Sequence, residues 1–253
     1  MNLQRVGPVV RREVRDFRRN RFVIVTMAAL PVVFLITPML TLFKIPDSAS
    51  GPQVKAAVGV ISLLLLIVPI VIPPVIAAYS VVGERDQGTL EPVLTTPVRG
   101  SELLLGKALA AFIPSVGVAY AIFFVVALSV EFGAAPVVQD VVFRPPQLLA
   151  QILFTPLLAL WSIWIGIGIS TRASDVRVAQ QLATLAGLPL LALTALFSFQ
   201  VLTPSVPLAL GLALALLIVD IVAWRIVSRL FDRERLLTGH ARSERQPQPQ
   251  PLA

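Results

Sequence analysis

The sequence contains no cysteine and a single histidine, which removes several classes of functional site. Without cysteine among its 253 residues, the chain cannot form a disulfide, an iron–sulfur cluster, a thiolate zinc site or a thiol nucleophile. Its one histidine, His240, lies in a polar segment, so a histidine-based metal site or catalytic triad has too few groups to assemble. We therefore expect no metal, no resident cofactor and no catalytic residue in this chain.

Charged residues are also scarce. They make up 14% of the chain, against about 25% in an ordinary soluble domain, whereas 56% of the residues are apolar and the mean hydropathy is +0.84. A helix needs about 20 consecutive apolar residues to cross about 30 Å of hydrocarbon, and this chain has several such runs. The composition therefore predicts an all-α, polytopic integral membrane protein.

Uncharged stretches set the predicted spans. The longest covers residues 178–219, or 42 residues; as one helix it would measure about 63 Å, roughly twice the bilayer core. Prolines and hydroxyl residues at 203–207 supply the place where it folds back. The sequence thus predicts six spans, at residues 22–43, 56–82, 108–130, 147–170, 182–201 and 207–227.

The distribution of positive charge predicts the orientation. Of the 21 lysines and arginines, 18 fall in the N-terminal segment, in the loops after the second and fourth spans, and in the C-terminal tail. The positive-inside rule then places both termini in the cytoplasm. The 18 arginines against 3 lysines are typical of a GC-rich prokaryotic genome, so we expect the inner membrane of a prokaryote. The net charge of +7 is explained by basic loops facing anionic membrane lipids, and we expect no nucleic-acid partner.

The two ends of the chain differ in character. Val6, Val10, Val14 and Phe17 recur at helical spacing among arginines, which predicts an amphipathic helix in the cytoplasmic interface, with a loose basic tail as the alternative. Residues 241–253 alternate glutamine and proline, a composition typical of disorder. We expect residues 1–240 to form one transmembrane domain.

The longest predicted cytoplasmic loop, residues 83–107, contains residues that are typical of a short, ordered helix. Gly88 and Thr89 can end one helix and begin another, which Pro97 would stop. This short helix would present three apolar residues on one face: Leu90, Val93 and Leu94. From the residues alone, this helix has two interpretations: it binds a groove on a partner protein, or it is part of an ordinary solvated connection.

A resemblance favours the first interpretation. The loop carries Glu84-Arg-Asp-Gln-Gly-Thr-Leu-Glu-Pro-Val-Leu-Thr-Thr-Pro97, followed by Glu102 and by Gly106-Lys107. This pattern resembles the characteristic loop of ABC-2 type transporter permeases. The segment Leu230-Phe-Asp-Arg-Glu-Arg-Leu-Leu237 resembles the tail that often follows their last span. With six spans and cytoplasmic termini, the resemblance covers nearly the whole chain.

The resemblance implies a transport subunit that works with other chains. Such a permease, an exporter in most of this family, has no ATP site of its own; a separate ABC ATPase subunit binds ATP and Mg²⁺. A second permease copy, identical or related, would complete the pathway, which opens by alternating access. The sequence agrees, since Gly-x4-Gly-Lys-Ser/Thr does not occur in it. By resemblance, the element that contacts the ATPase consists of Glu84, Arg85, Gly88, Thr89, Leu90, Glu91 and Pro97.

Three residues inside the spans are candidates for the translocation path. Asp220 is the only acidic residue well inside a span, and such a residue is a functional hypothesis by default; interhelical packing or contact with water is the alternative. Pro73 and Pro74 interrupt the second span and would form a hinge or a pore lining, or a static kink.

Two rival functions remain open. One is a self-sufficient, ion-coupled secondary transporter that uses Asp220 as its relay; a single intramembrane carboxylate and the lack of a visible internal repeat argue against it. The other, an intramembrane enzyme, is disfavoured because neither His-Glu-x-x-His nor Gly-x-Ser-x-Gly occurs. Ser162, Gly166 and Ser170 form a small face in the fourth span, for packing within the subunit or for a dimer seam.

Overall fold

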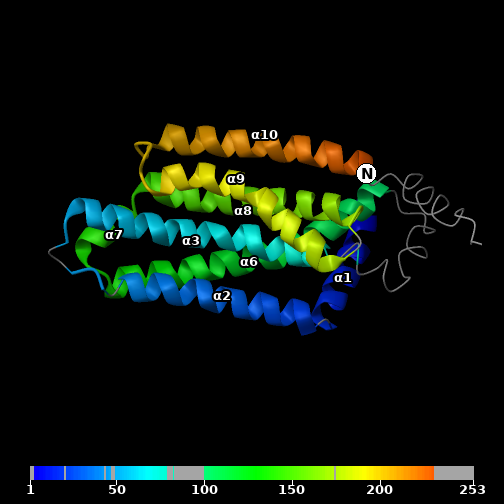
Figure 1. The fold of residues 1–253 in the computed structure, drawn as a ribbon, viewed down its shortest axis with the longest axis horizontal. Helices are drawn as coiled ribbons and strands as arrows, with labels where there is room; N and C mark the ends of the chain where they lie inside the picture. The colour runs from blue at the N-terminus through cyan, green and yellow to red at the C-terminus, as the bar shows by residue number, and fades with distance from the viewer. Residues whose placement is uncertain are drawn as a thin grey trace, which may run out of the picture.

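The computed structural model describes residues 3–19, 21–42, 44–46, 49–78, 82, 100–173 and 175–230. Within these ranges every regular element is a helix, which confirms the predicted all-α class. Figure 1 shows the long helices running side by side, with α1 across one end of the bundle and α7 at the other. The helices are α1 (Leu3–Arg19), α2 (Arg21–Leu42), α3 (Gly51–Ala78), α6 (Gly100–Gly133), α7 (Pro136–Val142), α8 (Pro145–Ser170), α9 (Val176–Ser198) and α10 (Val206–Leu230).

Five of the described helices are long and apolar enough to cross a membrane: α3, α6, α8, α9 and α10. A shorter apolar stretch, Val32–Thr41, lies within α2. Helices form here because hydrocarbon offers no partner to a free backbone N–H or C=O, so each segment must satisfy its own hydrogen bonds. The chain is therefore a multi-pass membrane protein, and each predicted span overlaps one of these helices.

The fold-back predicted inside the 42-residue uncharged run is confirmed, although α9 ends a little before the predicted span does. Gln200 N–H donates to the Phe197 carbonyl (3.0 Å) and Val201 N–H donates to the Leu196 carbonyl (3.1 Å). These two bonds form a Schellman motif, which closes a helix with a left-handed residue. Gln200 takes that role with φ 56°, where glycine is usual.

The short helix α7 was not predicted, because its seven residues are too few to show a helical period. The sequence nevertheless indicates where α7 begins, because Pro136 follows the extended residue Ala135 and proline is favoured at the first position of a helix. The Gln139 amide donates to the carbonyls of Val130, Glu131 and Ala134 at 3.0 to 3.2 Å. The side chain of Gln139 therefore ties α7 to the end of α6, where the Val130 carbonyl also accepts from the Ala134 N–H (3.2 Å).

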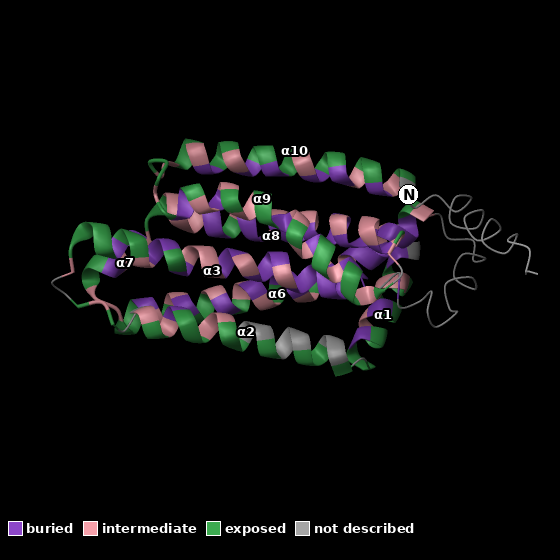
Figure 2. Ribbon diagram, viewed as in Figure 1, coloured by how far each residue is buried: buried purple, intermediate pink, exposed green. Residues whose placement is uncertain are grey.

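The core is built around α3, which packs against α2, α6, α8 and α9. By contrast, α10 packs chiefly on α8, and Figure 2 shows its buried residues on the side that faces the bundle. Its other side exposes apolar residues such as Leu214 and Ile218. In a bilayer these side chains contact lipid tails, which are as apolar as the side chains themselves.

The small face of the fourth predicted span is used inside the chain. A Cβ added to Gly166 of α8 would lie 2.9 Å from the Ala77 Cβ and 3.5 Å from the Pro74 Cα, both on α3. Across from it on α9, a Cβ at Gly187 would lie 2.5 Å from Ile70 Cγ2. Glycine at these positions lets the helix backbones approach closely, which confirms the predicted use in packing within the subunit.

Candidate functional site

The seven residues expected to contact an ATPase lie outside the described part of the chain, but both ends of their loop are described. On one side α3 ends at Ala78, and Val82 is also placed. On the other side α6 begins at Gly100. Residues 100–107 of the predicted loop 83–107 therefore form about two turns of helix, which continue as the rest of α6.

The α3 end of the loop is fixed in a small apolar cluster. Ala78 and Val82 are fully buried against Ala179 at the start of α9. Ile169 near the end of α8 and Ala173 in the turn before α9 are partly buried and complete the cluster. The described residues at this end of the loop, Ala78 and Val82, are therefore packed against α8 and α9.

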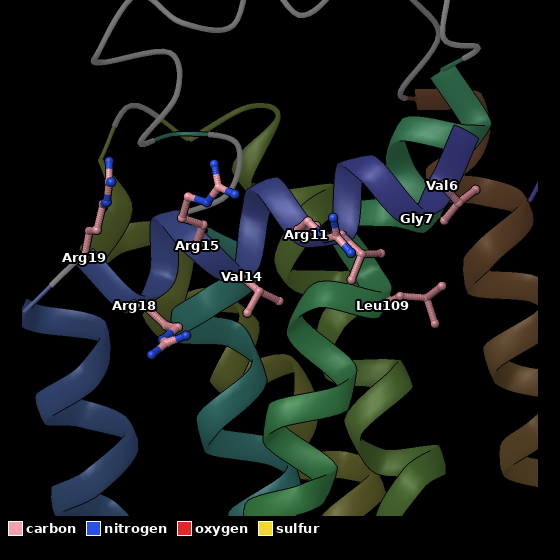
Figure 3. Close-up of a pocket in the computed structure, with 9 residues that line it drawn as sticks. Val6, Gly7, Arg11, Val14, Arg15, Arg18, Arg19 and Leu109 are labelled. Atoms are coloured by element: carbon pink, nitrogen blue, oxygen red, sulfur yellow. The ribbon is translucent and has the colours of Figure 1, made fainter. Parts of the chain in front are cut away.

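The α6 end of the loop is covered by α1. Figure 3 shows α1 lying across the ends of the long helices, with Leu109 of α6 below it. A Cβ added to Gly106 would lie only 2.5 Å from Val9 Cγ1 and 3.7 Å from the Val6 carbonyl oxygen. Glycine at this position is therefore what allows the two helices to approach so closely.

A buried ion pair joins the same two helices. The Lys107 ammonium lies 2.7 Å from Glu13 Oε1, and the two side chains are 0% and 6% exposed. A buried pair gains strongly from its short distance but loses the hydration of both charges, so its main effect is to specify one arrangement. Here it fixes the register of α1 against the start of α6, directly after the loop.

The pair of Glu13 and Lys107 was not predicted from the sequence, where Lys107 stands out only within the Gly106-Lys107 motif. The buried side of α1 runs through Val6, Glu13 and Phe17, whereas Val10 and Val14 are half-buried. Glu13 is thus a carboxylate on the apolar face of one helix, and Lys107 is an ammonium within an apolar segment of another. Opposite charges in two such places are the pattern that would have predicted the pair.

Asp220 lies on the side of α10 that packs on α8. It is 4% exposed, and neither carboxylate oxygen has a hydrogen-bond partner among the described residues. The contact between the Trp164 and Trp224 rings, with centroids 4.9 Å apart, sets the register of the two helices. Leu160 of α8 lies one turn before Trp164, and Asp220 of α10 lies one turn before Trp224. The Asp220 carboxylate therefore faces α8 and not the lipid.

Pro73 and Pro74 lie elsewhere, buried in the seam between α3 and α8. The helix α8 packs against both α3 and α10, while α3 and α10 have no extensive contact with each other in the described residues. The structure therefore does not bring the two prolines and Asp220 into one site. The described ranges also contain no group of three or more His, Cys, Asp or Glu side chains that could hold a metal ion.

The family model described as ABC-2 family transporter protein matches residues 8–239. The chain belongs to the ABC-2 transporter family. This confirms the resemblance found in the loop, and the match extends over every long helix. No curated protein matches the sequence.

Membership of the ABC-2 family defines the kind of subunit. An ABC-2 permease is the membrane-spanning transport component and is not itself the ATP-binding component. The family implies association with an ABC ATPase subunit. The ends of α3 and α6 that flank the loop therefore form the candidate functional site of this permease.

Proposed function

We propose that this ABC-2 permease couples ATP hydrolysis by a separate ATPase subunit to the export of a substrate. The loop between α3 and α6 would contact the ATPase, which binds ATP and Mg²⁺. The observation that carries the proposal is that both ends of the loop are held by buried contacts: Val82 in one cluster, and Gly106 and Lys107 under α1. A displacement of the loop by the ATPase would therefore move α3 and α6, because buried contacts fix both described ends of the loop.

The proposed topology has six spans, α1 in the cytoplasmic interface, and both termini in the cytoplasm of a prokaryotic inner membrane. The 22 residues of α2 would extend about 33 Å, enough to make it the first span. The 34 residues of α6 would extend about 51 Å, well beyond a 30 Å hydrocarbon core. Its start would therefore project into the cytoplasm, where α1 covers it and 18 of 21 basic residues are expected.

The proposed assembly contains two permease copies, identical or related, and two ATPase subunits. Closure of the ATPases on ATP would rock the two permeases between inward-open and outward-open states, a rigid-body transition of packed helices. The seam of α3, α8 and α9, with Gly166 and Gly187 in close contact with α3, suits such motion because it is tightly packed. Pro73 and Pro74 lie within this seam, where a bend in α3 would act.

The test is purification of the tagged chain from its native membrane in mild detergent, with mass spectrometry of its companions and a vanadate-sensitive ATPase assay. A stoichiometric companion that carries a phosphate-binding Gly-x4-Gly-Lys-Ser/Thr motif is expected. Changing Glu84→Gln and Glu91→Gln should release it or uncouple its ATPase activity. Glu131→Gln is the matched control, because Glu131 is an exposed acid at the opposite end of α6. A chain that is always alone and inert toward ATP would overturn the proposal.

A second candidate function, ion-coupled secondary transport, is favoured by one observation. Asp220 is buried without a hydrogen-bond partner among the described residues, as a relay carboxylate would be. Flux measurements on Asp220→Asn in vesicles separate the two functions. Loss of proton-driven flux with the loop intact and no ATPase bound would support the relay, whereas ATP-driven transport that survives the substitution would exclude it.

A further inference from the structure

An open groove of about 850 Å³ runs along α1 where this helix crosses α6. Residues of α1 and Leu109 of α6 line it. Figure 3 shows the residues that line it. A volume of this size lies within the range of small-molecule sites.

One part of the groove is apolar. Val10 and Val14 of α1 and Leu109 of α6 are half-buried along it, and Figure 3 shows Val14 turned toward the long helices. Gly7 leaves it open, because a Cβ added there would meet nothing within 4 Å. This part of the groove therefore suits hydrocarbon that approaches along the spans.

The other part of the groove is strongly basic. Arg11, Arg15, Arg18 and Arg19 all line it and are all exposed. Figure 3 shows Arg15 and Arg19 turned away from the long helices and Arg18 turned toward them. Within the described part of the chain, the ion pairs of α1 are Arg12 with Asp16 and Glu13 with Lys107. Among the described residues, no carboxylate forms an ion pair with the four arginines of the groove.

We propose that this groove binds an anionic phospholipid of the adjoining leaflet. The phosphate would be held by Arg11 and Arg18, because each guanidinium group can donate two parallel N–H···O hydrogen bonds to phosphate oxygens. The first part of the acyl chains would lie on Val10, Val14 and Leu109. A bound lipid would tie α1 to α6 beside the Glu13 and Lys107 pair. The inference goes beyond the proposed function and rests on the proposed placement of α1 in the membrane interface.

The experiment is native mass spectrometry of the purified full-length chain, titrated with phosphatidylglycerol or with phosphatidylcholine of the same acyl chains. The parent should retain phosphatidylglycerol preferentially. Arg11→Gln with Arg18→Gln should weaken that retention about tenfold or more, since two charge-assisted contacts are lost. Arg12→Gln is the matched control for Arg11→Gln and Arg18→Gln made one at a time, because it removes one charge from the same helix outside the groove.

A second variant tests the groove without changing its charge. Gly7→Phe adds a large side chain where space is open and should also reduce retention of phosphatidylglycerol. Unchanged retention in the double arginine variant, or an equal loss with Arg12→Gln, would overturn the inference. So would displacement of the lipid by millimolar inorganic phosphate, which would indicate a free-phosphate site. If the double arginine variant loses an ATPase companion and still retains phosphatidylglycerol, the groove is a protein-docking surface, which also overturns the inference.

Discussion

Lys107 is fully buried, with its ammonium 2.7 Å from the Glu13 carboxylate. Removing both charges from water costs several kcal/mol for each ion, and the short contact offsets much of this cost. An apolar pair of similar volume would hold α1 at least as firmly. The pair therefore matters at the residue scale because it selects one register, next to the loop proposed to contact the ATPase.

We expect Lys107→Met to weaken the docking of α1 by about 3 to 5 kcal/mol, because Glu13 loses its lysine counter-ion in a buried place. The arginines of α1 should then be cleaved faster in a limited tryptic digest. Combining Lys107→Met with Glu13→Leu should restore slow cleavage, since the buried carboxylate is gone. A single variant that is digested as slowly as the parent would contradict this role for the pair.

Gln200 offers a second prediction at the residue scale. Its φ of 56° places a non-glycine residue in the left-handed region, which costs roughly 1 to 2 kcal/mol. Gln200→Gly should therefore raise the free energy of unfolding by up to about 1 kcal/mol, measured by thermal unfolding in detergent. Gln180→Gly makes the same change inside α9 and should destabilise by a similar amount. Equal effects of one sign would refute the argument.

At the scale of elements, α8 joins the two halves of the bundle. It packs on α3 and α9 through Gly166 and Ser162, and on α10 through Trp164 and Gly168. A Cβ at Gly168 would lie 3.3 Å from Val227 Cγ2 on α10. Small residues on α8 thus set the distance to its neighbours, and α8 is the element through which α3 and α10 can influence each other.

We expect Gly166→Leu to lower the free energy of unfolding by about 1 to 3 kcal/mol, the usual cost of overpacking. The new side chain would have to displace Ala77 and Pro74 of α3. Gly211→Leu on α10 is the control, because a Cβ there meets nothing within 4 Å. Thermal unfolding in one detergent compares the two variants. Similar midpoints for both would show that the seam is looser than the structure indicates.

At the scale of the whole molecule, the membrane topology can be mapped with single cysteine substitutions, because the chain itself contains no cysteine. Ser101 and Phe132 are exposed near opposite ends of α6. In intact cells, a membrane-impermeant maleimide should label Phe132→Cys, and Ser101→Cys only after permeabilisation. The reason is the positive-inside rule, which places the α6 start in the cytoplasm. Labelling in the reverse order would invert the proposed orientation.

Most of the fold could be predicted from the sequence because the bilayer imposes simple lengths. Apolar runs located every long helix, and the break at 203–207 was anticipated. The site was predicted less completely. The loop motif indicated the family, which the match over residues 8–239 confirmed. The loop residues themselves lie outside the described ranges, so their contacts stay a prediction, and the Glu13 and Lys107 pair was missed.

The sequence by itself determined the helices, the membrane environment and the family, because hydropathy and a local motif are properties of neighbouring residues. Only the tertiary structure decided which helix faces meet. It placed Gly106 under Val9, joined residues 94 positions apart in the Glu13 and Lys107 pair, and separated Asp220 from Pro73 and Pro74. The physical reason is that in lipid all faces of an apolar helix have similar hydropathy, so contacts depend on the packing of small residues and paired charges.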